Sequence, residues 1–267
     1  MKVAALQFNI TWENPTENFR ILEEMVEKSD LPPGTLLVLP ELFAVGFTMD
    51  VQKLGEPEDG PTWQFLRRLA MKYQLHVLGG QLVLGAGGKG LNRCIGFASN
   101  GTSLGTYQKL QPFAPGGESA SYQAGSQPML FQLGDIRIGP FICYDLRFPE
   151  IFRPLGRQAT HLYTVIASWP IARIHHWERL LKARAIENQA FLVGVNRTGQ
   201  DPLLTYSGKS LIIDYHGEIL ADAGAEPGVI TAELDLNALD EYRKKCPFLS
   251  DIRPDYVQSI SKSSTES

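Results

Sequence analysis

The segment Leu36-Leu-Val-Leu39 restricts the fold of this chain more than any other feature. It contains four consecutive aliphatic residues and is followed directly by Pro40. A run this short and this uniformly apolar predicts a strand buried on both faces, which occurs where helices cover a sheet. Predicted strands and helices alternate in both halves of the chain, without an internal repeat. The sequence therefore predicts an α/β fold, in which helices cover a mixed sheet system.

The patterns of apolar and turn-forming residues set the expected elements. Two helices are predicted to begin at Asn14 and Gly60, and two more to span residues 149–157 and 172–188. Residues 110–127 lack periodicity and predict a long, packed functional loop. The predicted strands are residues 2–8, 36–39, 76–84, 92–99, 102–109, 136–142, 160–167, 191–196, 207–214, 218–221 and 229–234.

Composition narrows the class of protein. With 267 residues, 43% of them hydrophobic, the chain can bury one large core, so we expect a single domain over residues 1–257 and a polar, disordered tail over 258–267. The formal net charge is −4 and no basic cluster occurs, which argues against nucleic acid and anionic membranes as partners. No signal-peptide pattern or membrane-length apolar run is present, so we expect a cytoplasmic protein.

The cysteines and histidines do not form a metal-site pattern. Cys94, Cys143 and Cys246 lie far apart, without the paired spacing of a zinc site or a disulfide framework. No His-Glu-x-x-His motif occurs either. We therefore expect reduced thiols, no metal and no cofactor.

Three polar residues share one position relative to predicted strands. Glu41, Lys109 and Cys143 each follow an apolar strand, at the end where ligands bind in open α/β sheets. Each alone is weak evidence, because a charge at a strand end usually marks the point where the chain meets water. Together they supply a nucleophile, a cation for an oxyanion and a carboxylate that can take the thiol proton.

Cys143 is the candidate nucleophile. It follows the run Ile136–Ile142 and precedes Pro149-Glu150, which can open a helix. In such a turn the amides of a helix N-terminus can lower the pKa of a thiol. A buried structural cysteine is equally compatible with this stretch alone.

Other nucleophile arrangements have less support. His175 and His176 could serve as the base of a Cys-His pair, but a helix surface or a packed ring accounts for them better. His76, His161 and His216 fall in predicted strands or turns. The motif Gly-x-Ser-x-Gly of α/β-hydrolases is absent.

Several ordered motifs carry a family resemblance that covers nearly the whole chain. They are Leu39-Pro-Glu-Leu-Phe43, Tyr107-Gln-Lys109, Gly116-Gly-Glu118 and Ile142-Cys-Tyr-Asp-Leu-Arg-Phe-Pro-Glu150. The chain resembles the nitrilase superfamily of carbon-nitrogen hydrolases, and Ala167-Ser-Trp-Pro170 makes it most similar to the ω-amidase group. The resemblance implies a four-layer α-β-β-α sandwich and a homodimer. It also implies cleavage of small linear amides, such as 2-oxoglutaramate, to an acid and ammonia.

The resemblance also implies roles for individual residues. Cys143 would be the nucleophile that forms a thioester and Glu41 the general base. Lys109 would stabilise the oxyanion together with the backbone N–H of Tyr144, and Glu118 would be a supporting carboxylate. The partners would be a small-molecule amide and water.

The substrate pocket is the least constrained part of the resemblance. Many family members have a histidine where this chain has Gln111, a difference that we interpret as bearing on substrate. A substrate carboxylate requires a cation, for which Arg147 and Arg173 are candidates, although a structural ion pair explains Arg147 equally well. An N-carbamoyl compound, deaminated glutathione and a non-catalytic binding module are the alternatives. Phe43, Phe113 and Phe148 are the expected apolar walls of the pocket.

Overall fold

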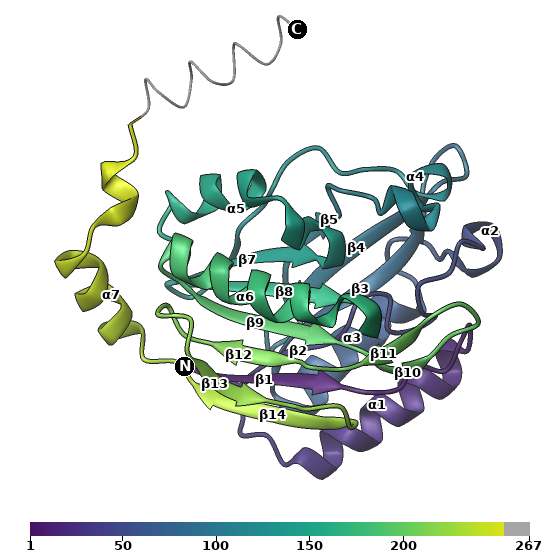
Figure 1. Ribbon diagram of the computed structural model, residues 1–267. Helices are drawn as coiled ribbons and strands as arrows, with labels where there is room; N and C mark the ends of the chain where they lie inside the picture. The colour runs from purple at the N-terminus through teal and green to yellow at the C-terminus, as the bar shows by residue number, and fades with distance from the viewer. Residues whose placement is uncertain (254–267) are drawn as a thin grey trace, which may run out of the picture.

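Two six-stranded sheets pack face to face in the structure, a computed structural model that describes residues 1–253 (Figure 1). Helices cover both outer faces, so the layers follow the order α-β-β-α. This confirms the predicted fold class. The proposed tail at 258–267, and residues 254–257 of the proposed domain, lie outside the described residues.

The first sheet contains most of the aliphatic segment Leu36-Leu-Val-Leu39. Its strand β2 (Leu36–Val38) pairs in parallel with β1 (Lys2–Gln7) and β3 (His76–Leu84), and all three of its residues are fully buried. Helices cover the outer face of this sheet, where Leu37 packs, and the second sheet covers its inner face, where Leu36 and Val38 pack, which explains the burial on both faces. The rest of the sheet contains β14 (Gly228–Glu233), β4 (Gly90–Phe97) and β5 (Ser103–Gln108), in the order β14-β1-β2-β3-β4-β5.

The second sheet contains the strand that leads to Cys143. Strand β7 (Ile136–Ile142) pairs in parallel with β8 (Leu162–Ala167), which pairs in parallel with β9 (Phe191–Asn196). Antiparallel strands complete it on both sides in the order β13-β12-β9-β8-β7-β6, with β13 (Ile219–Asp222), β12 (Leu211–Ile213) and β6 (Phe131–Leu133).

Amphipathic helices bury the outer faces of the sheets. Helix α1 (Pro15–Ser29) begins where Asn14 accepts a hydrogen bond from the Glu17 N–H, and it packs near α3 (Pro61–Tyr73) over the first sheet. Helices α5 (Pro149–Gly156) and α6 (Ile174–Asn188) cover the second sheet (Figure 1). The shorter elements are α2 (Val51–Leu54), α4 (Glu118–Ser121) and α7 (Leu236–Lys245), with 3-10 turns η1 (Ala114–Gly116), η2 (Cys143–Arg147), η3 (Ile171–Arg173) and η4 (Phe248–Asp251).

One predicted strand is wrong. The sequence predicts a continuous strand over residues 207–214, but Gly208 and Lys209 adopt φ values of +65° and +62°. This left-handed backbone ends β11 (Thr205–Ser207), which pairs with β10 (Thr198–Gln200) in a separate hairpin, and β12 begins only at Leu211. The predictions also lack β6, β10 and α7. Among residues 1–253, no helix has the length and apolar character needed to cross a bilayer.

Candidate active site

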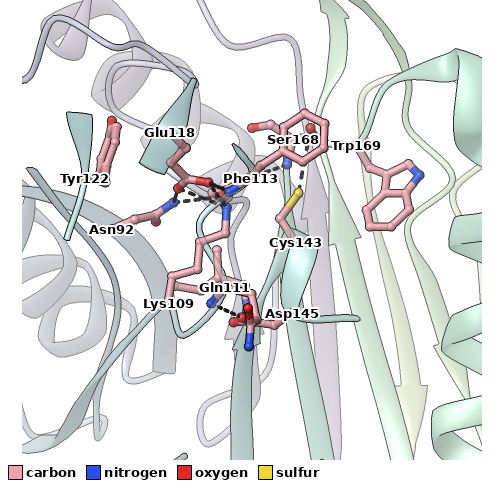
Figure 2. A network of polar contacts seen from close by, with 12 residues as sticks. Asn92, Lys109, Gln111, Phe113, Glu118, Tyr122, Cys143, Asp145, Ser168 and Trp169 are labelled. Carbon is pink, nitrogen blue, oxygen red and sulfur yellow. Dashed lines mark hydrogen bonds and ion pairs between the residues drawn. The ribbon is translucent and has the colours of Figure 1, made fainter. Parts of the chain in front are cut away.

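The residues at the three strand ends converge between the two sheets. Lys109 directly follows β5, Cys143 directly follows β7, and Glu41 lies three residues beyond β2. The Lys109 Nζ lies 2.9 Å from the Glu41 Oε1. It lies 3.0 and 2.8 Å from the two carboxylate oxygens of Glu118 (Figure 2). Glu118 comes from α4, inside the loop predicted to be functional.

Lys109 is a buried ammonium between two buried carboxylates. Glu41 and Glu118 are 0% exposed and Lys109 is 1% exposed. Burial alone lowers the pKa of Lys109, but the charges of Glu41 and Glu118 outweigh it and raise that pKa well above its ordinary value. The site therefore has a fixed cation, as stabilisation of a developing oxyanion requires.

Cys143 faces this cluster from the second sheet. Its Sγ lies 3.9 Å from the Ser168 carbonyl oxygen, and the Ser168 N–H donates to the Glu41 Oε2 across 2.8 Å. The Cys143 backbone has a φ of +47°, a strained conformation for a residue with a side chain, and η2 begins there. The nucleophile turn is therefore a left-handed residue followed by a 3-10 turn.

The expectation of a lowered thiol pKa is wrong. Burial of Cys143, with a further contribution from the charge of Glu41, raises the pKa of the thiol well above its ordinary value. The charge of Lys109 and the contact with Ser168 oppose this shift but do not reverse it. The resting residue is a neutral thiol, so it needs a neighbouring base to become a nucleophile.

A glycine on the neighbouring strand lets Glu41 reach the cluster. A Cβ atom on Gly80 of β3 would lie 2.3 Å from the Leu42 N and 2.9 Å from the Glu41 carbonyl carbon. Leu42 itself has a φ of +44°, which turns the chain sharply after the glutamate. Only a residue without a side chain permits this close approach of two backbones.

A pocket opens above the thiol. Arg147 and Arg173 line it together with Phe113 and Tyr144, as the sequence predicts for the first three. Phe148 does not line the pocket, which corrects the prediction, and its ring lies 5.1 Å from that of the lining residue Tyr144. The remaining lining residues are Phe47, Cys143, Ser168, Trp169, Pro170 and Leu204.

Phe43 does not line this pocket, which corrects the prediction. It is fully buried on the outer side of the first sheet, where its ring lies 6.1 Å from the rings of Phe19 and Phe65. Phe47 lines the pocket instead, with its ring 5.3 Å from the Lys109 Nζ.

The two pocket arginines rest on aromatic rings. The guanidinium of Arg147 lies 4.6 Å from the Trp169 ring, and that of Arg173 lies 5.4 Å from the Phe113 ring. Neither forms an ion pair with a carboxylate of residues 1–253. Burial and the charge of Arg173 lower the pKa of Arg147. Two cations in one pocket, without carboxylate partners among the described residues, favour an anionic ligand.

The histidine alternative has no support in the geometry. His176 lies at the start of α6 with its Nδ1 3.5 Å from an Arg147 nitrogen, and its ring packs against His175. The hydrogen bond found for the Cys143 thiol within residues 1–253 goes to Ser168. Gln111 does not line the pocket, and its backbone N–H donates to Asp145.

Sequence reasoning missed several residues of the site. Asn92 donates hydrogen bonds to both Glu41 and Glu118, and Asp145 accepts a hydrogen bond from the hydroxyl of Tyr107. A polar side chain in the apolar strand β4 was the available signal for Asn92. Within the described part of the chain, no group of three His, Cys, Asp or Glu side chains is placed to hold a metal ion.

Comparisons with known proteins agree with this geometry. The sequence profile of the carbon-nitrogen hydrolase family matches residues 2–244. A 2-oxoglutaramate amidase of Bacillus subtilis is 36% identical over 95% of this chain and 98% of its own length, and the omega-amidase YafV of Escherichia coli K12 is 35% identical over 94% and 96%.

A solved structure extends the likeness to the fold. XC1258 of Xanthomonas campestris, a CN-hydrolase superfamily protein with an arsenic adduct in its active site, superposes with a TM-score of 0.87 at 30% identity, over 95% of this chain and 97% of that one. The matched family profile and the full-length relatives lead to one conclusion: this chain is an enzyme of the carbon-nitrogen hydrolase family.

Proposed function

We propose that this enzyme is an ω-amidase, which hydrolyses the terminal amide of a dicarboxylic acid monoamide such as 2-oxoglutaramate. The observation that carries the proposal is the shared pocket of Cys143, Arg147 and Arg173. An amide placed at the thiol leaves the far end of a short substrate near two cations that lack carboxylate partners within residues 1–253. Relatives named as 2-oxoglutaramate amidase and omega-amidase support the same substrate class.

The first step of the proposed reaction forms a tetrahedral intermediate, which becomes a thioester when ammonia leaves. Glu41 takes the proton of the Cys143 thiol as the sulfur attacks the amide carbon, because the thiol is neutral at rest. The carbonyl oxygen then becomes an oxyanion beside the Lys109 ammonium and the backbone N–H of Tyr144. A donor aimed at an oxyanion typically contributes ~3–4 kcal/mol to the transition state.

The later steps reuse the same groups. Glu41 returns its proton to the amide nitrogen, the C–N bond breaks and ammonia leaves. A water molecule then gives a proton to Glu41 and attacks the thioester. The C–S bond breaks, the carboxylic acid leaves, and Glu41 returns the proton to the Cys143 sulfur. Glu118 supports Lys109, since it contacts the ammonium with both oxygens before the substrate reacts. Amide and water are consumed, and acid and ammonia are produced.

The walls of the pocket fit a short acyl chain. Phe113, Tyr144 and Trp169 offer apolar surfaces between the thiol and the guanidiniums. Arginine binds a carboxylate through two parallel hydrogen bonds, which fixes the orientation of the substrate. A monoamide with one free carboxylate satisfies both ends of the pocket, whereas a neutral amide leaves the arginines unpaired.

Ammonia release tests the proposal. The wild-type protein is expected to release ammonia from 2-oxoglutaramate and succinamate, and Cys143→Ala is expected to abolish this release without loss of the fold. Cys246→Ala is the matched control, since that thiol lies after α7 and outside the pocket. Turnover by Cys143→Ala would refute the proposed nucleophile. A preference for deaminated glutathione or an N-carbamoyl compound would instead replace the proposed substrate.

We also propose a homodimer that acts in the cytoplasm, with residues 1–257 as one domain. The exposed apolar side chains of Ile186 on α6 and Phe248 on η4 support a contact between subunits. Light scattering after gel filtration measures the molar mass, for which the dimer requires twice the 29.6 kDa of one chain.

A further inference from the structure

The hydrogen-bond capacity of Glu118 is fully used. Its Oε1 accepts from Lys109 and Asn92, each at 3.0 Å. Its Oε2 accepts from Lys109 at 2.8 Å and from the Phe113 backbone N–H at 2.5 Å. A carboxylate has about four lone-pair sites in total. Glu118 therefore has no position left at which to receive a proton.

Glu41 keeps one acceptor position open. Its Oε1 accepts from Asn92 at 2.8 Å and from Lys109 at 2.9 Å, while among residues 1–253 its Oε2 accepts only from the Ser168 N–H. The carbonyl of Ser168 contacts the Cys143 thiol. The open position is therefore on the Oε2 of Glu41, and Ser168, which donates to this oxygen, also contacts the Cys143 thiol. A proton from the thiol can bind Glu41 at this position.

The protons of Lys109 are also fully used. One goes to Glu41 and the other two go to the two oxygens of Glu118. To donate to a substrate oxyanion, the ammonium has to release one of these three contacts, and the contact with the Oε1 of Glu118 is one of them. The amide of Asn92 already donates to the Oε1 of Glu118, so this oxygen keeps a donor when the lysine turns away.

We infer that Asn92 is a positioning residue: its amide holds both glutamates around Lys109 and compensates Glu118 when the lysine turns to the oxyanion. This inference rests on the roles proposed above for Glu41 and Lys109. Asn92 is 1% exposed, and its Oδ1 has no hydrogen-bond partner among residues 1–253. A flipped amide would place that oxygen against two carboxylates, which fixes the observed orientation.

The replacement Asn92→Leu tests the inference, because leucine has a similar size and no donors. The expected result is a fall in kcat of about tenfold to a hundredfold, because loss of a hydrogen bond to a charged group typically changes a rate by this factor. KM should stay within about twofold, because Asn92 touches no part of the pocket. The acid side of the pH profile should move to higher pH, because a carboxylate that loses a donor is easier to protonate.

A neighbouring strand supplies the matched control. Gln81 of β3 is also 1% exposed, and its Nε2 donates to Glu56 at 2.8 Å, away from the site. Gln81→Leu removes a buried amide from the same sheet and should leave kcat and the pH profile unchanged. Equal falls in kcat for the two variants, or a wild-type profile in Asn92→Leu, would overturn the inference. If Asn92→Leu fails to fold, Asn92→Ser, which keeps one donor, should show a smaller loss in kcat with the same shift.

A second measurement does not depend on turnover. The rate at which iodoacetamide alkylates Cys143, followed by peptide mass across a pH series, reports proton transfer to Glu41. The acid-side midpoint is expected to move to higher pH in Asn92→Leu but not in Gln81→Leu, and an unmoved midpoint would contradict the role of Asn92. An inactive wild-type protein that still shows this shift would refute the proposed substrate and leave the positioning role supported.

Discussion

The hydroxyl of Tyr107 donates to the Oδ2 of Asp145 across 2.7 Å, in the buried space between the two sheets. Tyr107 lies two residues before Lys109, and Asp145 lies two residues after Cys143. The bond therefore ties the strand that carries the cation to the turn that carries the nucleophile. Asp145 also accepts the backbone N–H groups of Ile142 at 3.0 Å and Gln111 at 2.9 Å.

Replacement of Asp145 by asparagine should disturb this connection. An amide has one acceptor oxygen in place of two, so either Gln111 or Ile142 is left with a buried N–H that has no acceptor, at a cost of ~1–3 kcal/mol. We expect kcat to fall about tenfold with a lower Tm. Tyr107→Phe removes only one of the three bonds and should cost less in both quantities. Steady-state kinetics and thermal unfolding measure these effects, and a larger loss in Tyr107→Phe would contradict the assignment.

Asp145 should also impose a pH dependence on stability. Burial raises its pKa from the ordinary 3.8 to about 7, although the bond from Tyr107 opposes the shift. Between these pH values the folded protein holds a proton that the unfolded chain has lost. The contribution of this residue is therefore complete below pH 3.8 and declines as the pH rises through 7.

The variant Asp145→Asn lacks this titration. From pH 4 to pH 7, its free energy of unfolding should improve relative to that of the wild type by on the order of 4 kcal/mol, because the pKa of Asp145 is about 7 in the folded protein and 3.8 in the unfolded chain. Urea denaturation at pH values across this range measures the difference. If the difference in the free energy of unfolding between the two proteins stays constant over this pH range, the pKa of Asp145 is the same in the folded and unfolded protein, and the prediction is wrong.

The pocket arginines should determine substrate preference. Arg147→Gln and Arg173→Gln are each expected to lower kcat/KM for a carboxylated monoamide about tenfold to a hundredfold, since each removes a charge-assisted bond. For a neutral amide of equal length, kcat/KM should change little in either variant. Arg179→Gln is the control, because this exposed residue lies on α6 but outside the pocket. Equal losses for the charged and neutral amides would exclude recognition of a carboxylate.

The close approach at Gly80 should be intolerant of any side chain. In Gly80→Ala the new Cβ would collide with the backbone of Leu42 and Glu41, so the glutamate has to move away from Lys109. Displacement of a catalytic group by about 1 Å can cost on the order of a hundredfold in rate. We expect such a fall in kcat. Gly228→Ala, where a Cβ would meet nothing within 4 Å, should retain wild-type kinetics.

The strand ends that lie next to the catalytic residues can be predicted from the sequence. The predicted bounds of β3, β7 and β9 agree with the structure, because each is an apolar run with a clear polar or turn-forming limit. Glu41, Lys109 and Cys143 could therefore be placed near one another before their distances were known. Strands β2 and β5 run in the same direction, so Glu41 and Lys109 lie at the same edge of the first sheet, and Cys143 meets them from the second sheet.

The parts that could not be predicted depend on backbone turns and distant contacts. Leu42 and Gly46 adopt φ values of +44° and +81°, and this turn directs Phe43 into the core and Phe47 into the pocket. No periodicity in the sequence reveals such a turn. The role of Asn92 was equally hidden, since its two partners lie 51 and 26 residues away in the chain.

The division of the site between the sheets has a consequence for refolding. Glu41 and Lys109 follow strands of the first sheet, whereas Cys143 and Ser168 follow strands of the second. The bond from Ser168 to Glu41 spans 127 residues of sequence, and such non-local contacts form slowly. A refolding chain should therefore regain its helical and strand content before it regains catalysis. The rate at which enzyme activity recovers therefore measures how fast the two sheets pack together, which circular dichroism alone would not resolve.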